Sequence, residues 1–78
     1  MFDPRLLRAF VAIADTGSFT HAAERLHMTQ STISQQLGRL EEAVGHDLID
    51  RAARPVRSTA AGERLLGYAR RILALQQE

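Results

Sequence analysis

Three helix-ending residues, Gly17, Gly45 and Pro55, divide this chain of 78 residues into segments of limited length. Each glycine follows a run of apolar residues at helical spacing, and a left-handed residue that ends a helix costs least when it is glycine. Proline lacks an amide proton and clashes with the preceding turn, so no helix continues through residue 55. The sequence therefore predicts short helices up to Gly45, a non-helical segment around Pro55 and one longer helix after it.

Capping residues indicate where the first three helices begin. Asp3 can cap the first helix, and Pro4 suits its first position. Ser18 and Thr20 are both candidate caps for a short second helix. A turn of a few residues then leads to Thr29, which can cap the third helix.

The third helix, at about residues 30–44, has the clearest pattern in the chain. Four apolar residues fall within about 60° of one another at 100° per residue and mark its inward side: Ile33, Leu37, Leu40 and Val44. We expect Leu37 and Leu40 to be buried against the first helix. The N-cap and the exposed side of the N-terminal half carry short or amide side chains and no acid: Thr29, Gln30, Ser31, Thr32, Ser34 and Gln35. Such side chains can hydrogen-bond to base edges and phosphates, although most polar helix faces only contact solvent.

A β-hairpin and a long helix are predicted for the rest of the chain. Residues 47–51 and 56–59 are short extended candidates on either side of Pro55, and strands this short need packing support. Thr59 can cap a last helix that runs to about Gln77. Its apolar stripe consists of Leu65, Leu66, Ala69, Ile72 and Leu73. The predicted fold class is therefore mainly α: a winged helix-turn-helix of three helices and a short β-hairpin wing, followed by a long helix.

Positive charge is concentrated in two windows. Residues 25–40 contain no acid and carry +2, and residues 51–62 contain no acid and carry +3 through Arg51, Arg54 and Arg57. The whole chain carries only +1, so the remainder is acidic. Such segregation is typical of a polyanion-binding face, whereas charges scattered over a solvated surface are the plainer alternative.

Composition argues against several other classes of protein. Without cysteine the chain has no disulfide framework and no thiolate metal site, which fits a reducing cytoplasm. The longest apolar run is six residues, Ala9 to Ala14, so we expect no membrane span, and the first residues do not resemble a signal peptide. His21 and His27 face different ways on a helix, and no serine has a histidine at a meaningful spacing. We therefore expect no metal, no cofactor and no catalytic site.

The chain resembles the N-terminal DNA-binding domain of LysR-type transcriptional regulators. The resemblance rests on residues 10–37 and continues through residues 40–45, 48–51 and 59–62, in order and without gaps. It covers essentially all 78 residues and is far more specific than a lone helix-turn-helix pattern.

The resemblance implies a role for each part of the chain. Gln30, Ser31, Ser34 and Gln35 occupy positions that contact bases or the groove edge, and Arg54 matches a wing arginine near the backbone or minor groove. Residues 1–58 would form the DNA-binding domain, and residues 59–78 a linker helix that joins two subunits through the apolar stripe. The implied partners are an interrupted palindrome of double-stranded DNA and a second copy of the chain, with a tetramer possible for a full-length form.

Several positions depart from the family pattern. Many members have proline at the position of Ser31 and arginine at that of Gln35, so the sequence preference of relatives cannot be copied. Ile49 replaces a common phenylalanine, and Ser58 a common leucine. Members of the family usually carry a longer C-terminal effector-binding part that this sequence does not include, and we expect the chain to be an excised DNA-binding fragment rather than a truncated product.

Two other functions fit parts of the sequence. A helical dimerisation or protein-interaction module would use the last helix alone, but it would not need an acid-free polar helix face beside an arginine-bearing wing. An RNA-binding surface would need exposed aromatic side chains for stacking. Only Tyr68 and three phenylalanines are present, and Phe10 and Phe19 are expected to be buried.

Overall fold

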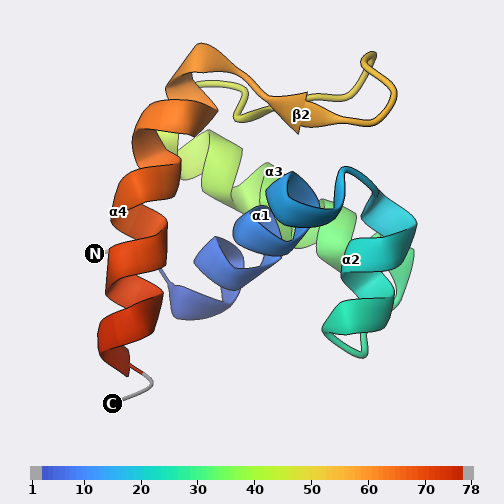
Figure 1. Ribbon diagram of the computed structural model, residues 1–78, viewed down its shortest axis with the longest axis horizontal. Helices are drawn as coiled ribbons and strands as arrows, with labels where there is room; N and C mark the ends of the chain where they lie inside the picture. The colour runs from blue at the N-terminus through green and yellow to red at the C-terminus, as the bar shows by residue number, and fades with distance from the viewer. Residues whose placement is uncertain (1–2, 77–78) are drawn as a thin grey trace.

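The computed structural model describes residues 3–76 as four helices and one two-stranded sheet (Figure 1). The helices are α1 (Pro4–Thr16), α2 (Phe19–Arg25), α3 (Gln30–Val44) and α4 (Ala60–Gln76). The strands are β1 (Ile49–Asp50) and β2 (Arg57–Ser58). This order confirms the predicted fold class. The predicted end of the last helix at about Gln77 lies outside the described residues.

The helices begin at the predicted capping residues. An oxygen of Asp3, Ser18, Thr29 or Thr59 accepts a hydrogen bond from a backbone N–H in the first turn of its helix, at 2.9–3.1 Å. Each bond satisfies an amide that has no partner within the helix. For α2, the sequence offered both Ser18 and Thr20 as the capping residue, and in the structure the cap is Ser18.

Three residues with positive φ separate the first helices. Gly17 ends α1 at φ 69° and Gly45 ends α3 at φ 84°, as predicted. His27, in the turn between α2 and α3, has φ 57°. The N–H of Met28 donates to the carbonyl of Ala23 at 2.9 Å and closes this turn. The sequence predicted the turn but not a left-handed histidine within it.

Helix α1 lies at the centre of the molecule and contacts all three other helices (Figure 1). The largest fully buried side chains come from α1, α3 and the residue before β1: Leu7, Phe10, Ile13, Ile33, Leu37, Leu40 and Leu48. The predicted burial of Leu37 and Leu40 is confirmed. Val44, at the end of the same stripe, is half-buried.

The hairpin is held by contacts with the helical part of the domain rather than by a long run of strand pairing. Its strands pair antiparallel through only two residue pairs, Ile49 with Ser58 and their neighbours, so it is shorter than predicted. The N–H of Val56 donates to the carbonyl of Gly17 at 3.0 Å, which fixes the wing to the turn between α1 and α2. The side chains of Ile49 and Val56 are buried, and the peptide before Pro55 is cis. Packing of this kind supplies the support that two short strands need.

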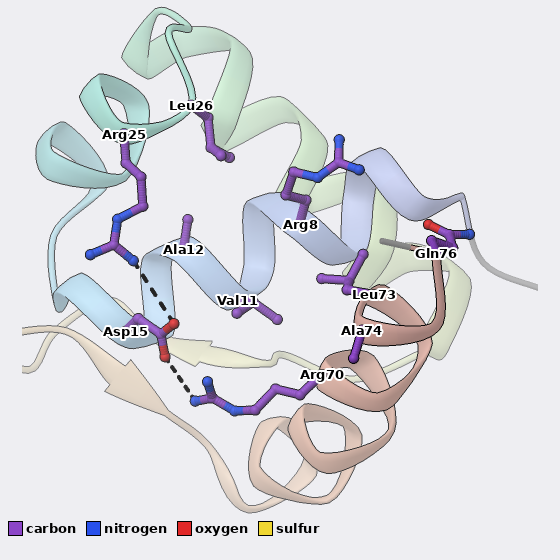
Figure 2. Close-up of a pocket in the computed structure, with 10 residues that line it drawn as sticks. All are labelled: Arg8, Val11, Ala12, Asp15, Arg25, Leu26, Arg70, Leu73, Ala74 and Gln76. Carbon is purple, nitrogen blue, oxygen red and sulfur yellow. Dashed lines mark hydrogen bonds and ion pairs between the residues drawn. The ribbon is translucent and has the colours of Figure 1, made fainter. Parts of the chain in front are cut away.

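Besides its apolar packing on the core, helix α4 makes two specific contacts with the rest of the domain. At its first turn, Gly62 lies so close to β1 that a Cβ atom there would be 2.1 Å from the carbonyl oxygen of Leu48. Further along, Arg70 donates to Asp15 of α1 at 2.8 Å, and Arg25 of α2 approaches the same carboxylate at 3.9 Å (Figure 2). These three charged residues lie at one end of a cleft between α1, α2 and α4.

No helix within residues 3–76 is both long and apolar enough to cross a bilayer.

Most of the apolar stripe of α4 packs against the core of the same chain. Ala69 is fully buried, and the other four predicted dimerisation residues are half-buried and pack against the core: Leu65, Leu66, Ile72 and Leu73. Tyr68 and Leu75, which the stripe omitted, are 64% and 69% exposed. Helix α4 therefore covers the domain with one side and presents apolar side chains on another.

Candidate nucleic-acid interface

The polar residues predicted on α3 lie together at its N-terminal end. Thr29, Gln30, Ser31 and Gln35 are exposed, whereas Thr32 and Ser34 are half-buried. No acidic residue interrupts this part of the helix. The surface offers hydrogen-bonding groups without a negative charge to repel a phosphate.

Thr29 and Thr32 hold the start of α3. Thr29 Oγ1 accepts from the N–H of Thr32 at 3.1 Å and donates to Thr32 Oγ1 at 2.9 Å. The hydroxyl proton of Thr29 is therefore engaged within the protein, whereas that of Thr32 remains available to a ligand.

Gln30 is connected to α2. The hydroxyl of Thr20 donates to Gln30 Oε1 at 3.3 Å. Because the Gln30 side-chain oxygen faces Thr20, the two N–H groups of the same amide face away from Thr20. Thr20, which the sequence suggested only as an alternative cap, instead contacts a predicted site residue.

A cleft of about 360 Å³ separates the wing from the starts of α2 and α3. Thr20 and Gln30 line one side, and Arg51 and Arg54 line the other. The two acid-free windows of the sequence thus meet in space at this cleft. This brings the predicted wing arginine, Arg54, to the same place as the predicted reading helix.

Arg54 is exposed, and part of its guanidinium is bound to the wing itself. Its Nη1 donates to the carbonyl oxygens of Arg51 and Ala53. Both acceptors are neutral, so the positive charge of Arg54 is not compensated by these contacts. Arg57, on β2, is also exposed and forms no ion pair with any residue from 3 to 76.

Arg51, Glu41 and Phe19 form a cluster that the sequence analysis missed. The guanidinium carbon of Arg51 lies 5.0 Å from the centroid of the Phe19 ring, and its Nη2 donates to Glu41 Oε1 at 3.3 Å. Phe19 is half-buried beneath this arginine, not buried as expected. Glu41 Oε2 also accepts from the backbone N–H of Leu48 at 2.8 Å. Arg51 also donates to Ser34 Oγ. The sequence contained one sign of this arrangement, because Ser34 and Glu41 are seven residues apart and therefore lie on the same side of α3.

Metal-ligating chemistry is sparse in the described part of the chain. Within residues 3–76 no group of three or more histidine, cysteine, aspartate or glutamate side chains is placed to hold a metal ion.

Comparison with protein families gives one match. The model described as "Bacterial regulatory helix-turn-helix protein, lysR family" matches residues 4–63. This range includes all of α1 to α3, the hairpin and the start of α4.

Similar curated proteins agree with this family match. The chain is 51% identical over 74 residues to the HTH-type transcriptional activator AllS of Salmonella paratyphi A, covering 95% of this chain and 24% of AllS. It is 47% identical to an uncharacterised HTH-type transcriptional regulator of Azotobacter vinelandii, covering 92% of this chain and 50% of that protein. The chain thus spans about a quarter of AllS.

The similar structures include several complexes with DNA. The BenM DNA-binding domain bound to benA site 1 DNA superposes with a TM-score of 0.92 at 38% identity, covering 97% of this chain and 85% of that one. The CbnR DNA-binding domain in complex with DNA gives a TM-score of 0.90 at 41% identity, covering 97% and 87%.

Proposed function

Because the chain belongs to the lysR family of bacterial regulatory helix-turn-helix proteins, we propose that it binds double-stranded DNA in a sequence-specific manner. One observation carries this proposal: Gln30, at the exposed, acid-free end of α3, lies across a single cleft from Arg54 of the wing. An α-helix fits the major groove, and arginines beside it neutralise phosphates. The DNA complexes of the BenM and CbnR domains, which have the same fold, support the proposal.

The proposed roles follow the placement of the side chains. Gln30, Ser31, Ser34 and Gln35 face the major groove, and Arg54 lies near the sugar-phosphate backbone or in the minor groove. Thr29 and Thr32 shape the end of α3 that approaches the DNA. The serine at position 31 and the glutamine at position 35 give this chain a sequence preference of its own.

The proposed assembly is a two-fold symmetric dimer. Residues 1–58 act as the DNA-binding domain and residues 59–78 as the linker that joins two subunits, which places two α3 helices on an interrupted palindrome. The whole protein is a regulator of transcription rather than an enzyme and acts in the cytoplasm, and a full-length form has the option of a tetramer.

A selection experiment tests the proposed function directly. A mobility-shift titration against random-sequence duplexes, followed by repeated selection and sequencing, should enrich a single interrupted palindrome. The rival function, a protein-interaction module built on α4, predicts weak binding and no enriched sequence.

Gln30 and Arg54 should contribute to DNA binding in different ways. Gln30→Ala removes a contact to a base edge, so it should weaken operator binding by ~1–3 kcal/mol and leave non-specific binding nearly unchanged. Arg54→Ala removes charge, so it should weaken both and reduce the slope of log affinity against log salt by about one. Titrations of operator and random duplexes at several salt concentrations measure both effects.

Two outcomes would contradict these roles. An equal loss of affinity for operator and random duplex in Gln30→Ala would show that Gln30 does not read a base. A change confined to the preferred sequence in Arg54→Ala, at A·T pairs beside the half-sites, would show that Arg54 reads the minor groove instead of holding phosphates.

Dimer formation through α4 is expected on the operator. The predicted residues of the stripe are only half-buried, apart from Ala69, and the exposed Tyr68 and Leu75 extend the apolar surface of α4. Sedimentation should show two chains on a full operator. A strict monomer both free and on the operator would refute the dimer.

A further inference from the structure

Arg51 joins three parts of the structure through its guanidinium group. It follows β1 directly, stacks on Phe19 of α2, and reaches two residues of α3: Nη1 donates to Ser34 Oγ at 3.4 Å, and Nη2 donates to Glu41 Oε1 at 3.3 Å. A planar guanidinium can make all three contacts at once because its face stacks while its edge donates. We call these four residues the Arg51 cluster.

The charge of Arg51 is already compensated inside the protein. Glu41 pairs with it, and the Glu41 side chain is only 13% exposed. The other oxygen of Glu41 accepts from the N–H groups of Leu48 and Ile49, so the carboxylate is fixed in place. An arginine paired in this way releases few counterions from DNA, in contrast to Arg54 and Arg57, whose charges have no such partner among residues 3–76.

The contact with Arg51 also determines how Ser34 can act. A serine hydroxyl can donate one hydrogen bond and accept others. Because a guanidinium donates to Ser34 Oγ, the oxygen lone pair faces a positive charge and the hydroxyl proton points away from it. Ser34 is therefore held as a donor. The acceptors that DNA offers are phosphate oxygens and, in the major groove, purine N7, guanine O6 and thymine O4.

We propose that Arg51 is a positioning residue of the interface: it holds the wing against α3 and orients Ser34 as a hydrogen-bond donor, instead of binding a phosphate itself. This inference rests on the proposed DNA-binding function. It separates the three arginines of the wing into one that organises the site and two that face the DNA.

A double-mutant cycle with salt titrations tests the assignment on the selected operator. Arg51→Gln should weaken binding about tenfold, but by no more than about threefold when Ser34→Ala is already present, because the two residues act through one contact. The salt slope should stay unchanged in Arg51→Gln. In the matched control Arg57→Gln, on the neighbouring strand, the slope should fall by about one and the loss should be independent of Ser34.

Arg51→Lys provides a second variant that keeps the positive charge and the pairing with Glu41. Lysine lacks the planar fork, so we expect Arg51→Lys to lose nearly as much affinity as Arg51→Gln. A phosphate contact would instead be restored by lysine. Melting curves of each variant confirm that binding is measured on folded protein, and Arg51→Lys replaces Arg51→Gln in the cycle if the latter does not fold.

The outcomes separate the inference from the proposed function. Additive losses, a reduced salt slope in Arg51→Gln, rescue by lysine, or no loss at all would each overturn the positioning role while leaving sequence-specific binding intact. If the unmodified chain enriches no sequence from random duplexes, the proposed function fails, and the inference fails with it.

Discussion

Leu40→Ala is expected to lower the free energy of unfolding by ~2–5 kcal/mol. Leu40 is fully buried on the side of α3 that packs on α1, and its removal leaves a cavity among side chains that cannot all collapse into it. A domain of this size has a total stability of only about 5 kcal/mol or slightly more, so much of the variant should be unfolded. Urea denaturation followed by circular dichroism measures the loss.

Leu75→Ala serves as the control for this experiment. It deletes the same atoms from a leucine that is 69% exposed on α4, so the change should stay within ~0.5 kcal/mol. A similar small change for Leu40→Ala would mean that the inward face of α3 has been wrongly assigned.

Gly62→Ala should destabilise the domain by about 3 kcal/mol, at the upper end of the usual cost of overpacking. The new methyl group would lie 2.1 Å from the carbonyl oxygen of Leu48 and 3.0 Å from its carbon. Both are backbone atoms that cannot rotate away, so α4 and β1 would have to separate. The expected sign is opposite to helix propensity, which favours alanine over glycine by ~1 kcal/mol within a helix.

Gly67→Ala is the matched control on the same helix. No atom lies within 4 Å of the position that its Cβ would occupy, so only the propensity gain of up to ~1 kcal/mol should remain. Thermal unfolding of the two variants should therefore shift in opposite directions. Equal stabilisation by both would show that α4 does not approach β1 as closely as described.

Features that depend on neighbouring residues were predictable from the sequence. The caps at Asp3, Thr29 and Thr59 and the left-handed glycines at the ends of α1 and α3 each need only a few adjacent residues, and all were confirmed. The inward side of α3 was also predictable, because apolar residues at helical spacing share one face whatever they pack against.

Features that depend on distant residues were not predictable in the same way. The bond from Leu48 to Glu41 and the stacking of Arg51 on Phe19 join segments whose relative placement follows from the packing of the whole core. From the sequence, Arg51 was therefore identifiable only as a charge in an acid-free window. The length of the two strands was overestimated for a similar reason. The hairpin is positioned by the hydrogen bond from the Val56 N–H to the carbonyl of Gly17, so it does not need long strands.

The residues proposed to contact DNA remain predictions in their individual roles. The structure brings Gln30 and Arg54 to one cleft, which the sequence suggested only through separate charge windows. Which base each side chain reads depends on the path of the DNA, and the selection experiment and the Gln30 variant address that point.

The close approach of Gly62 to Leu48, the burial of Ala69 and the ion pair of Arg70 fix the direction of α4 relative to the domain. A helix of 17 residues is ~26 Å long at 1.5 Å per residue. Tilting a helix of this length by about 10° at its first turn moves its far end by ~4.5 Å, which exceeds the ~3.4 Å rise of one base pair. In the proposed dimer joined through α4, the direction of this helix therefore sets the spacing between the two α3 helices, although no residue that holds α4 in place needs to touch DNA.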